Sequence, residues 1–228
     1  MKNYIKIVLL TGLITLGFHA GAADKPERVL IVGDSMMRVT AHALTLALDK
    51  HPEVTTKSQT SLGSGLARLD AYDWMEKIDG LVAEFNPDMS VVWFGTNDRQ
   101  AMKTETGIVN IADPNWEDEY SRRIGMVLDK LSSKGGKVIW LELPVMRDSD
   151  ITANVDIVNR LAKVEADKRD AVTYFPTRNL LGRKNDTYSA NIISPQGKMI
   201  QLRASDGVHL SRAGADRVAE AVDKDLYK

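Results

Sequence analysis

The sequence contains no cysteine, and this absence excludes several kinds of chemistry. Without thiols the chain can form no disulfide bond, no thiolate metal site and no cysteine nucleophile. It also offers no cysteine to which a lipid anchor could be attached. An exported chain without disulfides fits a bacterial periplasm, where a core of sufficient size makes cross-links unnecessary.

The sequence also lacks an excess of either charge, since 30 lysine and arginine residues oppose 31 aspartate and glutamate residues. Holding nucleic acid by bulk electrostatics requires a clear positive excess, so we expect no nucleic-acid partner. No internal repeat, low-complexity tract or linker rich in proline, glycine or serine divides the chain. Length and composition therefore predict one domain with a single sizeable core.

The first residues have the pattern of a signal peptide. Lys2 and Lys6 precede an apolar run over residues 7–18, and Ala20-Gly21-Ala22 offers the small residues that signal peptidase prefers. We expect cleavage after Ala22, with Ala23 as the alternative. A retained membrane anchor is the competing interpretation, but the run is short for a bilayer span.

This pattern divides the chain into a signal peptide over residues 1–22 and one domain over residues 23–228. It predicts a periplasmic or secreted protein without stable membrane insertion after the signal is removed. The oligomeric state stays open.

Apolar runs and helical periodicity alternate along the rest of the chain. Strands are predicted over residues 28–33, 54–59, 89–95, 137–143 and 171–175. Helices are predicted over residues 35–50, 70–85, 116–133, 150–167 and 211–226, and a small hairpin over residues 188–202. This alternation predicts a mostly parallel five-stranded sheet in a three-layer α/β/α arrangement of the flavodoxin-like kind.

Three polar blocks fall where strands end or helices begin. They are Gly33-Asp34-Ser35, Gly95-Thr96-Asn97-Asp98 and Asp206-Gly207-Val208-His209. Taken singly, each block has an ordinary interpretation as a helix cap, a turn or a surface loop. Because functional crevices in such sheets lie beyond the carboxyl ends of the strands, we expect the three blocks to meet.

Together the blocks supply the groups for acyl transfer through a serine ester. Ser35 lies at a helix N-terminus, Asn97 carries an amide that can hold an oxyanion, and Asp206 can orient the ring of His209. We interpret the remaining histidines of the mature chain, His42 and His51, as structural or surface residues.

From about Arg28 to its end, the chain resembles the SGNH (GDSL-type) hydrolase superfamily, whose first, third and fifth blocks look like these three. The resemblance implies Ser35 as nucleophile, His209 as general base and then acid, and Asp206 as its orienting partner. It implies an oxyanion hole made by the Ser35 N–H, the Asn97 side chain and a glycine N–H of a second block. That block looks most like Ser64-Gly65-Leu66-Ala67-Arg68, which favours Gly65, with Gly63 as the alternative.

Further segments resemble an exported bacterial branch of this superfamily that is often left as a domain of unknown function. They are residues 97–100, 116–120, 143–147 and 203–207. The resemblance implies a serine esterase that removes or transfers short acyl groups, most simply O-acetyl groups, on a saccharide of the cell envelope. It requires no metal and no organic cofactor.

Four residues are candidates for contact with substrate: Asp34, Arg99, Gln100 and Arg147. Each could instead be a surface group without that role, and the two interpretations have even weight for Arg147. Two other functions compete with the short-acyl esterase: a lipid or thioester hydrolase, and a catalytically silent saccharide-binding or scaffold protein of the envelope. Hydrolysis and transfer to a second hydroxyl are not distinguished.

Overall fold

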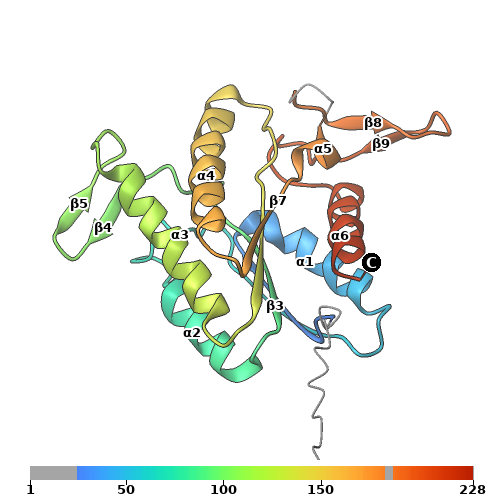
Figure 1. The fold of residues 1–228 in the computed structure, drawn as a ribbon. Coiled ribbons are helices and arrows are strands. Elements are labelled where there is room, and N and C mark those ends of the chain that lie inside the picture. The colour runs from blue at the N-terminus through green and yellow to red at the C-terminus, as the bar shows by residue number, and fades with distance from the viewer. Residues whose placement is uncertain (1–24, 183–186, 228) are drawn as a thin grey trace, which may run out of the picture.

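A parallel five-stranded sheet forms the centre of the protein (Figure 1). The computed structural model describes residues 25–182 and 187–227. The strands follow the order β2-β1-β3-β6-β7, and every neighbouring pair is parallel. Their bounds are β1 (Arg28–Gly33), β2 (Thr55–Thr60), β3 (Met89–Trp93), β6 (Lys137–Leu141) and β7 (Val172–Phe175). The five-stranded parallel sheet expected from the sequence is confirmed.

Helices cover both faces of this sheet, which gives three layers (Figure 1). On one face α1 packs against α6, and on the other α3 packs against both α2 and α4. The bounds are α1 (Ser35–Leu48), α2 (Trp74–Phe85), α3 (Trp116–Ser132), α4 (Ser149–Asp167) and α6 (Arg212–Leu226). The three-layer α/β/α architecture is therefore confirmed as well.

The strand order determines where a functional crevice can form. The chain continues from β1 to its neighbour β2 on one side, and then returns to β3 on the other side of β1. The connections that leave the carboxyl ends of β1 and β3 therefore diverge, which opens a crevice at that point. The blocks that carry Ser35 and Asn97 follow these two strands.

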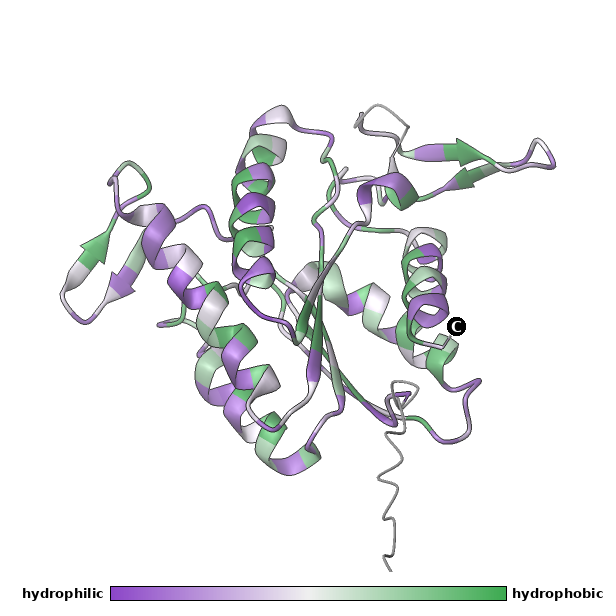
Figure 2. Cartoon of the chain, viewed as in Figure 1, coloured by the Kyte–Doolittle hydropathy of each residue, from purple (hydrophilic) through white to green (hydrophobic). Residues whose placement is uncertain are grey.

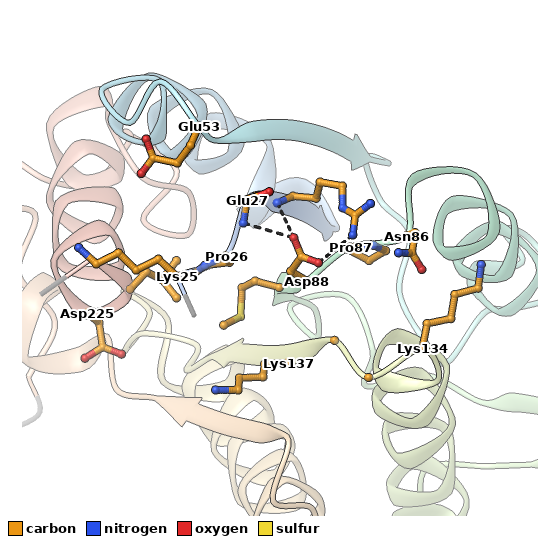
Figure 3. Close-up of a pocket in the computed structure, with 15 residues that line it drawn as sticks. Lys25, Pro26, Glu27, Glu53, Asn86, Pro87, Asp88, Lys134, Lys137 and Asp225 are labelled. Atoms are coloured by element: carbon orange, nitrogen blue, oxygen red, sulfur yellow. Dashed lines mark hydrogen bonds and ion pairs between the residues drawn. The ribbon is translucent and has the colours of Figure 1, made fainter. Parts of the chain in front are cut away.

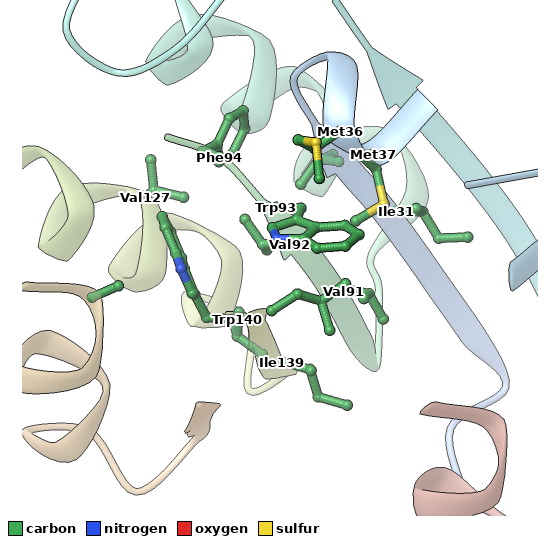
Figure 4. Packing of buried hydrophobic residues seen from close by; sticks show 14 of the residues in the cluster. Ile31, Met36, Met37, Val91, Val92, Trp93, Phe94, Val127, Ile139 and Trp140 are labelled. Carbon is green, nitrogen blue, oxygen red and sulfur yellow. The ribbon is translucent and has the colours of Figure 1, made fainter. Parts of the chain in front are cut away.

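Apolar side chains fill the space between the layers. Val29, Leu30, Ile31 and Val32 of β1 are all fully buried, as a strand covered on both faces requires. Trp93 and Trp140 lie in the same cluster, shown in Figure 4. Figure 2 shows the corresponding pattern on the helices, where apolar stripes alternate with polar ones.

Two small hairpins stand apart from the sheet (Figure 1). The hairpin of β8 (Asn191–Ile193) and β9 (Met199–Gln201) lies within the range where the sequence predicts one. The hairpin of β4 (Met102–Thr104) and β5 (Gly107–Val109) was not expected, nor was the short helix α5 (Arg178–Leu181). Strands of three residues are too short to show a period of two against a polar background.

One helix starts later than its periodicity indicates. We expected a helix from about residue 70, but α2 begins at Trp74. The Asp73 side chain accepts hydrogen bonds from the N–H groups of Met75 and Glu76, which makes Asp73 the N-cap. The preceding residues form a turn closed by the Arg68 carbonyl.

The expected signal peptide over residues 1–22 lies outside the described residues. Within the described part of the chain, every helix is too short or too polar to span a bilayer.

A hollow of about 780 Å³ opens at the amino ends of the strands (Figure 3). Its lining carries both charges, and Asp88 there accepts hydrogen bonds from the backbone N–H and the guanidinium of Arg28. Because Ser35 and Asn97 follow the opposite, carboxyl ends of their strands, this hollow is at the other pole from the reactive residues.

Candidate active site

Ser35 is the first residue of α1, directly after the turn that leaves β1. Asp34 caps the helix by accepting a hydrogen bond from the Met36 N–H at 2.8 Å. The Asp34 N–H donates to the Trp93 carbonyl at 3.1 Å, which ties the turn to the end of β3. The half-buried Ser35 hydroxyl is thus held at the positive end of a helix, where developing negative charge is favoured.

His209 and Asp206 complete a hydrogen-bonded relay with this serine. His209 Nε2 lies 2.8 Å from Ser35 Oγ, and His209 Nδ1 lies 2.7 Å from Asp206 Oδ2. Partial burial opposes the charge of Asp206, but bonds from the His209 ring and from two backbone N–H groups outweigh it. They lower the pKa of Asp206 to about 2. The carboxylate is therefore ionised at neutral pH and can orient the imidazole.

Two arginines hold the loop that carries this pair. Arg147 donates to the carbonyls of Ser205 and Asp206, both at 2.8 Å. Arg203 is almost fully buried. It donates to the carbonyls of Val208 and of Val145 in the neighbouring loop, both at 2.7 Å. The loop that carries Asp206 and His209 is therefore fixed from two sides.

Gly65 lies where the second block was expected to contribute an N–H. It is buried, and in the described residues neither its N–H nor that of Ser35 donates to another group. The alternative, Gly63, lies on an exposed turn with open space around it. Of the two glycines, Gly65 is therefore the one that is buried with an unengaged N–H, and its place in an oxyanion hole stays a prediction.

Asn97 lies beside the same block. Its Nδ2 donates one hydrogen bond to the Ser64 carbonyl at 3.0 Å, which leaves its second hydrogen for an oxyanion. Its backbone carbonyl accepts from the Gln100 side chain. The N–H groups of Ser35 and Gly65 and the second hydrogen of the Asn97 amide are thus unengaged in the described structure, and such donors are of the kind that stabilises a tetrahedral intermediate.

Asp34 is corrected from a substrate contact to a buried structural residue. Its side chain is 0 % exposed, and its two oxygens accept from the N–H groups of Met36 and Gly95. Burial raises the pKa of Asp34 to about 7, against the effect of these bonds. A carboxylate that is enclosed and engaged in this way cannot contact a substrate.

The other candidate contacts have different surroundings. The Arg99 guanidinium lies over the ring of Trp116, with 5.7 Å between its carbon and the ring centroid. The Gln100 side chain donates to the Asn97 backbone carbonyl. The backbone carbonyl of Gln100 accepts from Trp116 Nε1 at 2.7 Å. Arg147 is exposed, but both of its terminal nitrogens hold the catalytic loop. A role in substrate contact stays a prediction for these three residues.

The remaining histidines lie apart from the relay. His42 is exposed on α1, and His51 pairs with Asp223 at 2.7 Å while its ring stacks on Tyr227. Within the described ranges, no three side chains of the metal-binding types come together.

Sequence reasoning missed a buried cluster behind the oxyanion donors. Asp98, the last residue of the block that carries Asn97, accepts a hydrogen bond from the hydroxyl of Tyr120 on α3 at 2.6 Å. Arg123, one turn further along that helix, donates to the carbonyls of Leu66 and Ala67. Residues this far apart in the chain show no shared spacing, so only the fold reveals their contact.

Solved structures with the same fold include several ester hydrolases. An acetylxylan esterase from Geobacillus stearothermophilus is 16 % identical with a TM-score of 0.59, and 88 % of this chain and 94 % of that chain are covered. A GDSL-like lipase from Bacteroides thetaiotaomicron is 14 % identical with a TM-score of 0.56, with 88 % and 87 % covered. An alpha/beta hydrolase enzyme from the metagenome of Lake Arreo, Spain, is 18 % identical with a TM-score of 0.61, with 89 % and 97 % covered.

No curated protein matches the chain significantly. The solved structures share the architecture of SGNH (GDSL-type) hydrolases, so the expected fold family is confirmed. A sequence family described as "Protein of unknown function (DUF459)", which is SGNH-like, matches residues 28–225. The chain therefore belongs to this family.

Proposed function

We propose that the protein is a serine esterase of the SGNH type. The observation that carries the proposal is the continuous relay from Asp206 through His209 to the Ser35 hydroxyl, with both hydrogen bonds shorter than 2.9 Å. Such a relay activates a hydroxyl that is otherwise a weak nucleophile.

The first half of the reaction forms an acyl-enzyme. His209 Nε2 takes the proton of Ser35 while Oγ attacks the ester carbonyl carbon. The carbonyl oxygen becomes an oxyanion that the N–H groups of Ser35 and Gly65 and the Asn97 amide can hold. The carbon–oxygen bond of the ester then breaks, and the alcohol leaves with the proton from His209.

The second half removes the acyl group. A water molecule attacks the Ser35 ester and gives its proton to His209, and Ser35 regains its proton as the carboxylic acid leaves. A sugar hydroxyl in place of water would transfer the acyl group instead. These steps need no electron donor and no metal.

We favour a short acyl group, most simply an O-acetyl group on a saccharide of the cell envelope. A fatty acyl chain needs an apolar surface beside the nucleophile. Among the large apolar side chains that the described structure leaves exposed, only Val39 and Leu62 lie within four residues of the blocks that carry Ser35 and Gly65. The esterase from Geobacillus, which has the same fold, acts on acetylxylan. The signal-peptide pattern over residues 1–22 supports a periplasmic or secreted location.

Hydrolysis of p-nitrophenyl acetate and p-nitrophenyl octanoate by the mature protein tests this function. We expect turnover of the acetate, lost in Ser35→Ala and in His209→Gln. Ser133→Ala and His42→Gln are matched controls because both residues are exposed and lie outside the blocks. Both control variants should keep wild-type rates.

Each other outcome identifies a different function. Preference for the octanoate would indicate a lipid or thioester hydrolase. Acetate turnover that persists in folded Ser35→Ala would refute the mechanism. No serine-dependent turnover of either ester, together with no labelling of Ser35 by an activated phosphonate, would favour the silent saccharide-binding protein.

A further inference from the structure

Asp98 is a fully buried carboxylate that binds the second block. Its Oδ2 accepts from the Leu66 N–H at 3.0 Å, and its Oδ1 accepts from the Ala67 N–H at 2.9 Å. The Tyr120 hydroxyl, also 0 % exposed, donates to Oδ2 at 2.6 Å. Both carboxylate oxygens are thus occupied by donors from other segments of the chain.

The same carboxylate lies against the backbone of Gly65. A β-carbon on Gly65 would lie 1.9 Å from Asp98 Oδ1, so no larger residue fits without moving the carboxylate. The neighbouring Asn97 side chain donates to the carbonyl of Ser64. Two consecutive side chains, Asn97 and Asp98, therefore hold residues 64–67 on both sides of the Gly65 N–H.

Charges around Asp98 make its burial possible. Burial raises the pKa of Asp98, whereas the bonds from Tyr120 and the backbone and the nearby Arg123 guanidinium oppose that rise. Arg123 is 2 % exposed and donates to the carbonyls of the two residues whose N–H groups Asp98 accepts. Burial and the Asp98 charge also raise the pKa of Tyr120 well above its ordinary value, so its hydroxyl remains a donor.

We propose that Asp98 is a positioning residue for ester cleavage, which sets the Gly65 N–H in the oxyanion hole by fixing the loop that follows it. Tyr120 acts through Asp98 in the same way. Neither residue touches the reacting atoms. This inference rests on the proposed esterase function and deepens it, because it assigns a task to a helix outside the catalytic blocks.

Asp98→Asn is the sharpest test because it preserves size and removes one acceptor. An amide can accept at only one of its two ends, so either the Leu66 or the Ala67 N–H must lose its partner. We expect kcat for p-nitrophenyl acetate to fall on the order of 10²-fold with KM changed less than about threefold, the scale for one misplaced oxyanion donor. Tyr120→Phe should give a smaller fall in the same direction.

A boronic acid distinguishes positioning from a simple loss of folded protein. Phenylboronic acid forms a tetrahedral adduct with the serine, whose negative oxygen occupies the oxyanion hole. In Asp98→Asn we expect its Ki to rise at least tenfold, whereas a smaller folded fraction would lower kcat and leave Ki unchanged. Tyr227→Phe is the matched control, since its hydroxyl donates to the Pro26 carbonyl at the opposite pole.

Amide hydrogen exchange at Leu66 and Ala67 adds a readout that does not depend on activity. At least one of these two amides should exchange more than about tenfold faster in Asp98→Asn. If Asp98→Asn fails to fold, the kcat and Ki of Tyr120→Phe decide the question.

The inference is overturned if folded Asp98→Asn keeps kcat and Ki within about threefold, or if kcat falls while Ki does not change. It is also overturned if both amides keep their protection. A wild-type protein without serine-dependent turnover would instead refute the esterase function, which separates the two failures.

Discussion

At the scale of single residues, Gly207 combines two constraints in one position of the catalytic loop. Its φ of +80° lies in the left-handed region, which residues other than glycine rarely adopt. A β-carbon there would also lie 2.5 Å from the Cβ of Arg147. Position 207 must therefore be glycine for conformational and for packing reasons.

Gly207→Ala should be compared with Gly197→Ala, which has a φ of +77° but open space around it. The left-handed conformation should lower the free energy of unfolding of both variants by about 1–2 kcal/mol. In Gly207→Ala the clash with Arg147 should lower the free energy of unfolding further, by about 1–3 kcal/mol. It should also lower kcat about tenfold, because the loop must move. Urea unfolding and ester turnover measure both effects. Equal losses for the two variants would show that Arg147 does not constrain the loop.

At the scale of elements, helix caps serve different purposes in different layers. Asp34 and Asp73 both cap a helix through their side chains. The Asp34 side chain also accepts from the Gly95 N–H of another segment, whereas the Asp73 side chain accepts from N–H groups of its own helix. The Asp34 cap therefore links α1 to the segment after β3, whereas the Asp73 cap stabilises only the start of α2.

Asp73→Ala should lower the free energy of unfolding by about 1 kcal/mol, the usual contribution of an N-cap. We expect kcat to change less than about twofold, because the fully buried Trp74 keeps the start of α2 in place. Asp73→Asn, which retains a capping oxygen, should keep most of the stability. A large loss of turnover in Asp73→Ala would mean that this cap contributes to the site.

At the scale of the whole molecule, the enclosed carboxyl of Asp34 couples stability to pH. Its pKa rises from 3.8 to about 7 on folding because of burial, so the folded state binds the proton more tightly than the unfolded state. The stability that comes from this proton is present below about pH 4 and is lost as the pH rises through about 7.

The contribution of Asp34 to unfolding free energy should therefore fall by about 1 kcal/mol per pH unit within that window. Urea titrations between pH 4 and 8 on wild type and Asp34→Asn measure it, since their difference removes the effect of other groups. A difference that does not change with pH would contradict the prediction. Asp206 acts in the opposite sense, because its lowered pKa makes its stabilisation disappear as the pH falls below about 4.

The sheet, the layers and the meeting of Ser35 with His209 could be predicted because they depend on local patterns. Apolar runs mark the strands, and short polar blocks follow the strand ends. The role of Asp98 could not be predicted, because its partners Leu66 and Tyr120 belong to no recognisable motif, and an aspartate that follows Asn97 after a strand looks like an ordinary turn residue. Asp34 was misinterpreted because the sequence pattern of a capping aspartate next to a serine is the same whether its carboxylate is exposed or buried.

Ser35 and His209 come from opposite ends of the described chain, 174 residues apart. A ribosome makes Ser35 early, and the strands on both sides of β1 follow soon after it. His209 is made near the end, immediately before α6, which packs along α1. During synthesis the growing chain therefore carries a serine without its activating base. The contact between Ser35 and His209 can form only when this last segment docks, which would tie the proposed esterase activity to the completion of folding.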